Sequence, residues 1–381
     1  MKNDYFFWES YLIKTIHRIE MLMQEKEVIN ADFHMHSDYS ADGKQSLEEI
    51  ISRANTLGLD IIAITDHDSI NVYDELYDYL VKNELEKPII IPGVEFTVEN
   101  NEYGSQCHIL QLLINPKEKN LISNIEYNEK ALWTRIDIQF KRIRQNMALQ
   151  YFFEKYNINC LKDDYKEFLK NYNRPIPEYS TLMDYLMTIL RGNNISTWDL
   201  FYKLREDNEN DKCEERKQLK EKRYKILEER YIGNSDSCNS TRFLHSMLAI
   251  KGVDDDYFPQ YDSCGSLSVN QFNQLKIEQL NKNHLTIVAH PNEERIDIIN
   301  NMLRLNNNIF GMEFNKQTKY SDSRIFFDKL KELNMIQVIG SDSHSLDSIW
   351  YEDMSFYIAN KDELKKFLKK AEEYINLTKY K

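Results

Sequence analysis

The sequence of 381 residues predicts an α/β fold of the (β/α)-barrel type. Two observations indicate this class. Short apolar runs end repeatedly in a histidine or an acidic residue, and helical periodicity fills several of the intervals between those runs. In a (β/α) barrel the carboxyl ends of the strands meet on one rim, so residues that are distant in sequence converge there.

The expected strands share one feature: a histidine or an acidic residue, both possible metal ligands, lies at or beside each strand. A polar residue at the end of a single strand is ordinary, so it is the repetition that predicts a shared site. In chain order, the strands and these residues are 31–33 with His34 and His36, 59–65 with Asp66, His67 and Asp68, 88–94 with Glu95, 108–114 with His108, 285–289 with His290, 309–312 with Glu313, and 335–340 with Asp342 and His344.

Helical patterns lie before, between and after these runs. From Phe7 through Ile13 to Leu22, apolar residues recur at helical spacing, which is typical of a packing helix. Asn360 is expected to cap the last helix, with Glu363 three residues on as in a capping box. The expected helices are 3–28, 47–57, 72–83, 294–305, 322–333 and 361–374, and a further strand is expected over 354–358.

The alternation breaks over residues 117–283, which are rich in helical pattern, charge and turn signals. Within them, 203–230 hold ten Lys or Arg and nine Asp or Glu, which predicts a solvated helix face. Residues 135–144 have a net charge of +3 and are a candidate for phosphate contact. We therefore expect three parts: an N-terminal helical extension 1–29, a barrel built from 30–116 and 284–381, and a helical insertion subdomain 117–283.

Composition and charge exclude several classes of protein. With 49 Lys and Arg against 62 Asp and Glu, the formal charge is −13, which argues against a general nucleic-acid coat protein. The apolar runs are far shorter than the roughly 20 residues of a membrane helix, and the start of the chain lacks a secretion signal. Five widely spaced cysteines without a CxxC pair indicate free thiols, so we expect a cytoplasmic protein with no membrane association.

The histidines predict metal chemistry. Residues i and i+2 of a strand point to the same face, so His34 and His36 can reach one cation. Imidazole and carboxylate together suit Zn²⁺, Mn²⁺ and Fe²⁺. Six histidines at strand ends, with three acids, are too many for one tetrahedral ion, so two or three ions are expected. Glu95, on its own strand, is a candidate for the carboxylate that bridges them.

The motifs resemble those of the polymerase and histidinol phosphatase (PHP) family, most closely its stand-alone members that act on nucleotides and RNA ends. The resemblance rests on ADFHMHSDYSADG (31–43), IIAITDHDS (61–69), IPGVEF (91–96), the strand with His108, AHP (289–291), GMEF (311–314) and GSDSH (340–344). It covers about residues 31–115 and 284–350. It implies a distorted (β/α)7 barrel with three divalent metal ions.

The same resemblance implies which residues hold the ions. The first ion would take His34, His36, Glu95 and Asp342; the second would take Asp42, His67 and His344; the third would take Glu95, His108 and His290. Every ligand position of the family is thus filled, which favours an active hydrolase. Asp66 and Asp68 are expected to orient imidazoles. Arg242 and His245 are candidates for binding the substrate phosphate. Related members use an Arg-x-His stretch for this, and the sequence around Arg242 and His245 does not align cleanly with that stretch.

The expected activity is hydrolysis of a phosphate ester of a nucleotide or a nucleic-acid end by a metal-activated hydroxide. Asp42, Asp342 and His344 are the candidates for proton transfer, and the sequence does not choose among them. Alternatives are a nuclease acting on RNA or DNA strands within a larger, possibly ATPase-containing assembly, a metal amidohydrolase, and a non-catalytic interaction module. The insertion could bind a protein partner. Three ions, three carboxylates and one hydroxide would leave the pocket at about +2, so an acidic protein can still hold phosphate.

Overall fold

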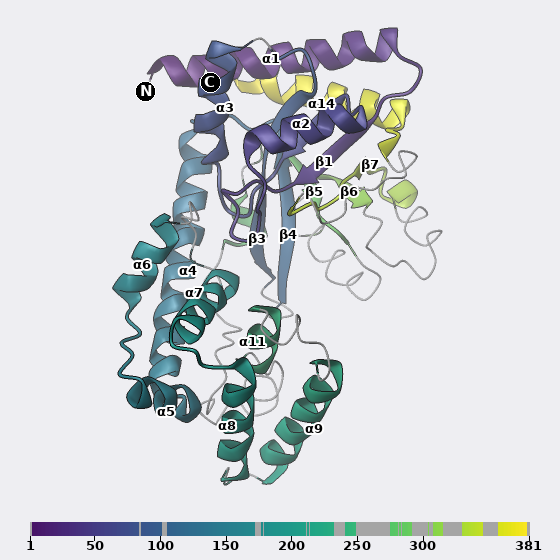
Figure 1. Cartoon of the computed structure of the whole chain (residues 1–381). Helices are drawn as coiled ribbons and strands as arrows, with labels where there is room; N and C mark the ends of the chain where they lie inside the picture. The colour runs from purple at the N-terminus through teal and green to yellow at the C-terminus, as the bar shows by residue number, and fades with distance from the viewer. Residues whose placement is uncertain are drawn as a thin grey trace. The chain divides into compact units, whose positions relative to one another are not determined.

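Figure 1 shows the computed structural model of the chain. It describes all residues except 1, 84, 101–104, 172–176, 178, 211, 213, 232–240, 249–274, 281, 283, 292–303, 305–307, 315–329, 346–356 and 379–381. The chain forms two compact units, Met1–Glu129 with Asn273–Lys381, and Lys130–Phe272. Among the described residues, no helix combines the length and apolar character that a bilayer crossing requires.

The described residues of the first unit form one curled sheet of seven strands, which confirms the α/β class. Neighbours in the sheet are also neighbours in the chain, from β1 to β7. The last strand leads back to the first, because Met35 and Ser343 form a parallel bridge and the His36 N–H donates to the Ser343 carbonyl at 2.9 Å. The strands are β1 (Ala31–Met35), β2 (Ile61–Ile64), β3 (Ile89–Asn100), β4 (Ser105–Leu112), β5 (Leu285–Val288), β6 (Ile309–Phe314) and β7 (Ile336–Ile339).

The sheet departs from simple β/α alternation at β4. This strand runs antiparallel to both β3 and β5, whereas the other neighbouring pairs are parallel. The link between Asn100 and Ser105 is too short for the crossover helix that a parallel pair needs. As a result His108 lies within β4 and pairs with Thr97, whereas the sequence led us to expect a strand that begins at His108.

Two helices follow the first two strands, as the sequence predicts. Helix α2 (Leu47–Leu57) is capped by Ser46, whose hydroxyl accepts the Glu49 N–H, while the Glu49 carboxylate accepts the Ser46 N–H. It ends at Gly58, which adopts the left-handed conformation with φ 69°. Helix α3 (Val72–Lys82) buries Val72, Tyr73 and Leu76. Both helices pack into the hydrophobic core on one side of the sheet.

Helices α1 (Lys2–Glu25) and α14 (Lys361–Thr378) lie together across the sheet (Figure 1). The buried face of α1 runs from Trp8 through Leu12 and Ile16 to Ile19, while Ile13, which we expected on that face, is 41 % exposed. Asn360 caps α14 as predicted, since its side-chain oxygen accepts the N–H groups of residues 362 and 363. The expected helices 294–305 and 322–333 and the strand 354–358 lie largely outside the described residues.

The part of the second unit that the structure describes is helical. Its described helices bury a core of aromatic and aliphatic side chains, including Phe140, Tyr165, Phe201 and Phe243. They are α5 (Met147–Lys155), α6 (Lys162–Asn171), α7 (Tyr179–Gly192), α8 (Thr197–Glu209), α9 (Glu214–Tyr231) and α11 (Thr241–Leu248), preceded by α4 (Lys119–Gln145), which begins in the first unit.

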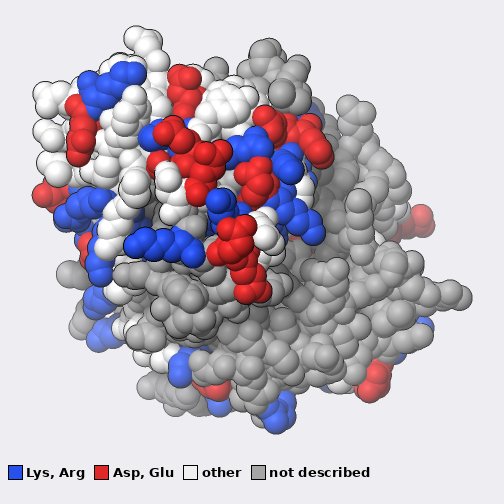
Figure 2. All heavy atoms as spheres, turned by 90° about the horizontal axis from the view of Figure 1, so that it is seen from below, with Lys and Arg blue, Asp and Glu red and all other residues white. Residues whose placement is uncertain are grey.

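Charges of both signs are interspersed on this part of the chain. Arg205 on α8 pairs with Glu221 and Glu228 on α9. On the face seen from below in Figure 2, the described Lys and Arg side chains are mixed with Asp and Glu. The described residues of 203–230 therefore behave as a solvated, ion-paired surface, as their near-zero net charge indicates.

Tyr73 offers a test of how α3 is attached to the sheet. Its buried hydroxyl donates to the Ile64 carbonyl at 2.5 Å and accepts the Gly93 N–H at 2.7 Å, so one group joins β2 to β3. We expect Tyr73→Phe to lower the free energy of unfolding by about 1–3 kcal/mol, because buried backbone groups lose their partner. Urea unfolding measures this loss.

Tyr77→Phe is the matched control, because Tyr77 lies on the same helix and its ring packs against Phe7 at a centroid distance of 4.7 Å. This variant should unfold at nearly the wild-type urea concentration. An equal loss in both variants would show that the hydroxyl of Tyr73 is not what attaches the helix.

Candidate metal centre

Two histidines at the end of β1 open the site. His34 is the fourth residue of the strand and His36 follows its last residue, so both rings point to the same side of the sheet. Both residues are fully buried. Their Nε2 atoms lie only 3.0 Å apart, which brings two lone-pair nitrogens to one point.

Glu95 on β3 stands at the centre of the cluster and is fully buried. Its Oε2 lies 2.9 Å from His34 Nε2 and 3.2 Å from His36 Nε2. Its other oxygen, Oε1, lies 3.0 Å from His108 Nδ1 and 3.0 Å from His290 Nε2. The two oxygens of one carboxylate therefore face two different sets of imidazoles.

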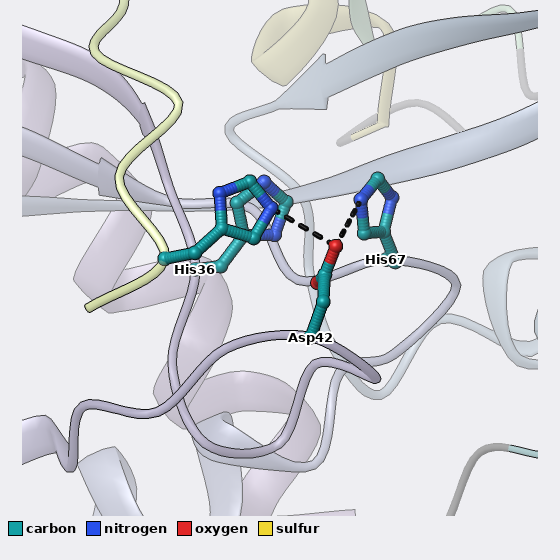
Figure 3. A group of neighbouring side chains, drawn as sticks. His36, Asp42 and His67 are labelled. Atoms are coloured by element: carbon teal, nitrogen blue, oxygen red, sulfur yellow. Dashed lines mark ion pairs between the residues drawn. The ribbon is translucent and has the colours of Figure 1, made fainter. Parts of the chain in front are cut away.

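A third group of side chains forms around Asp42, in the loop after β1. Asp42 Oδ2 lies 3.1 Å from His344 Nε2 and 3.6 Å from His67 Nε2. Figure 3 shows the Asp42 carboxylate directed at the ring of His67, with His36 nearby. His67 also links this group to the centre, because its Nδ1 lies 3.3 Å from Glu95 Oε2.

Asp342 completes the first set from the segment after β7. Its Oδ1 lies 3.1 Å from His36 Nε2 and 3.4 Å from His34 Nε2. The N–H of Asp342 donates to the His34 carbonyl at 2.9 Å, so the backbone itself fixes the spacing between the two segments. The structure thus brings together all nine residues expected from the sequence to hold metal: His34, His36, Asp42, His67, Glu95, His108, His290, Asp342 and His344.

Glu313 on β6 is a functional residue whose role the sequence analysis did not assign. Its Oε2 lies 3.0 Å from His34 Nδ1 and accepts the backbone N–H of His290 at 2.5 Å. A carboxylate on Nδ1 holds the proton there and leaves Nε2 of His34 free as a ligand. Gly340 is required beside it, since a Cβ would collide with the Glu313 carboxylate and with the Cβ of His34 at 2.6 Å.

Other imidazoles are oriented by oxygen atoms close at hand. His344 Nδ1 donates to the Asp342 carbonyl at 2.7 Å, which directs its Nε2 toward Asp42. The Ser40 hydroxyl lies 3.3 Å from His36 Nδ1 and 3.0 Å from Asp42 Oδ1. Fixed tautomers of this kind are typical of metal-binding histidines.

Asp66 has a different role from the one predicted, whereas the predicted role of Asp68 stays a prediction. Asp66 was expected to orient an imidazole, but it accepts both the backbone N–H and the hydroxyl of Ser37 at 2.6 Å each. Asp68 accepts the Thr97 N–H at 3.2 Å and the Asn128 side-chain amide at 2.7 Å. Asp66 therefore fixes the backbone directly after His36, and Asp68 fixes the backbone two residues after Glu95. The prediction for Asp66 was wrong because the TDHD segment alone does not show which groups face its carboxylate.

Three residues of this region adopt left-handed backbone conformations. The φ angles are 45° at Asp68, 24° at His290 and 55° at Asp342. Such conformations cost about 1–3 kcal/mol each and persist only where surrounding contacts hold them. Two of the three residues supply side chains to the cluster, so strain is concentrated where the side chains must converge.

The acids and bases of the centre shift one another's pKa values in the metal-free protein. Burial opposes ionisation of Glu95, but His34, His67 and His108 outweigh it and hold its pKa well below the usual range. Burial also opposes the charged form of His36, yet hydrogen bonds with Asp342 and Glu95 raise its pKa to about 10. In contrast, burial lowers the pKa of His67 to about 3.

The donor set fits divalent cations. Imidazole nitrogens and carboxylate oxygens gather in three groups: His34, His36, Glu95 and Asp342; His36, Asp42, His67 and His344; and His67, Glu95 and His108, with His290 beside the last. Neutral nitrogens 3.0 Å apart repel unless a proton or a metal lies between them. These residue types suit Zn²⁺, Mn²⁺ and Fe²⁺. The side chains of Arg242 and His245, on α11, lie outside the described residues.

Comparisons with known proteins found one family model and similar solved structures. The PHP domain model matches residues 32–212, which include His34, His36, Asp42, His67, Glu95 and His108. A candidate metal-dependent phosphoesterase from Bifidobacterium adolescentis is similar in structure, with a TM-score of 0.56, 14% identity, and coverage of 90% of this chain and 96% of that one. Its similarity supports the fold.

A second solved structure, an amidohydrolase from Chromobacterium violaceum, has a TM-score of 0.48 and 17% identity over 84% of this chain and 88% of that one. Comparison with curated protein sequences gave no match.

Metal binding is predicted to release protons. Neighbouring carboxylates raise the pKa values of His34 and His36 in the metal-free protein, so this cluster holds protons that a metal ion must displace, because a ligand must be neutral. Zn²⁺ affinity should therefore rise with pH until the pKa of about 10 of His36 is reached. Calorimetric titration in two buffers of different ionisation enthalpy counts the protons.

His17→Ala is the control, since the His17 side chain is 70% exposed on α1, and it should release as many protons as the wild type. His36→Ala should release fewer. Zn²⁺ binding with no release of protons would contradict the assignment of these imidazoles as ligands.

Proposed function

We propose that this chain is a PHP-family hydrolase with a multinuclear metal centre, and that it cleaves a phosphate ester. The single observation that supports this most strongly is Glu95, a buried carboxylate whose two oxygens face separate sets of imidazoles. Metal ions that share a bridging carboxylate are the arrangement that stabilises both the attacking and the leaving oxygen in phosphoryl transfer.

In this proposal three ions are held as the sequence motifs imply. His34, His36, Glu95 and Asp342 would hold the first, Asp42, His67 and His344 the second, and Glu95, His108 and His290 the third. When bound, such ions polarise the phosphoryl oxygens and lower the pKa of a water molecule to near neutrality. They are Mn²⁺, Zn²⁺ or Fe²⁺ by the chemistry of the donors.

Proton transfer requires side chains at the solvent-accessible edge of the cluster. The Asp42, Asp342 and His344 side chains are 38%, 24% and 27% exposed, whereas Glu95 and His34 are fully buried. These three groups can therefore meet both substrate and solvent, as can His108 and His290, which are 30% and 27% exposed. Of these accessible residues we assign proton transfer to and from the reacting oxygens to Asp42, Asp342 and His344, the candidates from the sequence.

We further propose that the substrate is a nucleotide or the end of a nucleic-acid strand. The resemblance of the motifs to nucleotide-acting PHP proteins supports this. So does the charge distribution, because an acidic chain with a cationic pocket favours a small anion or an inserted strand end over a long duplex.

The test is direct. The purified protein is analysed for bound metal, then supplied with Mn²⁺ and assayed against nucleoside mono- and bisphosphates, labelled RNA and labelled DNA. Release of phosphate or of nucleotides supports the proposal. Amide substrates in the same panel separate the amidohydrolase alternative, which predicts ammonia or acetate without phosphate release. A protein that binds metal and cleaves none of these would contradict the proposed class.

Glu95→Gln tests the bridging carboxylate. The amide keeps the shape but removes the charge that both sets of imidazoles face. We expect a lower metal content per chain and a loss of activity of more than about 100-fold, beyond the 10–100-fold typical of residues outside the first coordination shell. Elemental analysis and the phosphate-release assay measure the two effects.

Glu118→Gln is the matched control, because Glu118 also pairs with a histidine, His284, at 2.8 Å, away from the metal centre. It should retain both metal and activity. Full activity of Glu95→Gln would remove the basis of the proposed function.

A further inference from the structure

One buried side-chain amide joins four parts of the first unit. Asn128, on α4, is fully buried. Its Nδ2 donates to Asp68 Oδ1 at 2.7 Å and to the Thr97 carbonyl at 2.9 Å. Its Oδ1 accepts the Leu275 N–H at 2.7 Å. Both donors and the acceptor of the amide are therefore used.

Asn128 lies close to the point where the chain passes from the first unit to the second. It is one residue before Glu129, where the first unit ends and the chain continues along α4 into the second. Leu275 lies just after Asn273, where the chain returns to the first unit. The outgoing and the returning segments are thus fastened to each other, and to Asp68 and Thr97, by one amide.

The other two partners lie beside site residues. Asp68 follows His67 directly, and its own N–H donates to the Glu95 carbonyl at 2.9 Å. Thr97 is two residues beyond Glu95 on β3, and its N–H donates to Asp68 Oδ1 at 3.2 Å. Asp68 also holds a left-handed conformation, with φ 45°. This turn sets the direction in which the imidazole of His67 leaves the backbone.

The groups around this position require a side-chain amide. The Leu275 N–H requires an acceptor, while the Asp68 carboxylate and the Thr97 carbonyl require donors. An aspartate would place a second carboxylate against Asp68, and an alanine would leave buried polar groups without partners.

We propose that Asn128 is a positioning residue for the metal centre. Through Asp68 and Thr97 it fixes His67 and Glu95, and it fastens them to the two points where the chain leaves and re-enters the first unit. The geometry of the metal ligands then depends on how those two crossings are held. This inference rests on the proposed function only in that the centre binds metal.

The experiment compares Zn²⁺ binding by calorimetry in the full-length wild type, Asn128→Ala and Asn128→Asp. We expect affinity to fall by about 10–100-fold in Asn128→Ala, as is typical when the support of a ligand is lost, and further in Asn128→Asp. Asp68→Asn combined with Asn128→Asp removes the carboxylate repulsion and restores one donor. The double variant should bind more tightly than Asn128→Asp alone.

Asn115→Ala separates positioning from general stability. Asn115 is also a buried asparagine of the first unit with two hydrogen bonds, to the Tyr5 carbonyl at 3.2 Å and from the Lys117 N–H at 3.0 Å. Thermal unfolding of the metal-free proteins should show a loss in both alanine variants, while Zn²⁺ affinity should fall only in Asn128→Ala.

Two results would overturn the inference in different ways. If the wild type binds Zn²⁺ and the Asn128 variants bind it equally well, Asn128 has no positioning role and the proposed function stands. If the wild type binds no divalent metal, the proposed function fails and this inference fails with it.

Discussion

The structure of the first unit depends on one constraint, the burial of a carboxylate among imidazoles. Glu95 has no access to solvent, and its charge is stabilised by histidines on both sides. An isolated carboxylate would be very costly at such a position, so the surrounding strands must deliver cationic or metal-binding partners to both of its oxygens. The reversal of β4, the bridge between Met35 and Ser343 and the buried Glu313 all serve that requirement.

Much of the site could be predicted from sequence, because its residues lie at positions set by strand geometry. His34 and His36 share a face because strands have a period of two, and strand ends gather because parallel strands point the same way. These rules are local or depend only on fold class. The full set of nine residues was expected from the resemblance to the PHP family, and the α/β class was expected from the alternation of short apolar runs with helical patterns.

What the sequence did not predict depends on contacts between distant segments. The role of Glu313 follows from the position of His34 Nδ1, and the role of Asn128 follows from Leu275, almost 150 residues away. Asp66 faces Ser37 rather than a ring, which the TDHD letters cannot indicate. Ile13 fits the apolar spacing of α1 yet is 41 % exposed, because helical periodicity tolerates a face wider than the core it meets.

The order of the strands has a consequence for synthesis of the protein. Glu95 and its first imidazoles leave the ribosome well before β5, β6 and β7, which lie beyond the whole second unit in the chain. At about 5–20 residues per second, roughly 10–50 seconds separate Glu95 from Asp342. During that interval the nascent chain holds an acidic group and histidines without their remaining partners. The complete set of nine side chains can therefore converge only after β5, β6 and β7 have been synthesised.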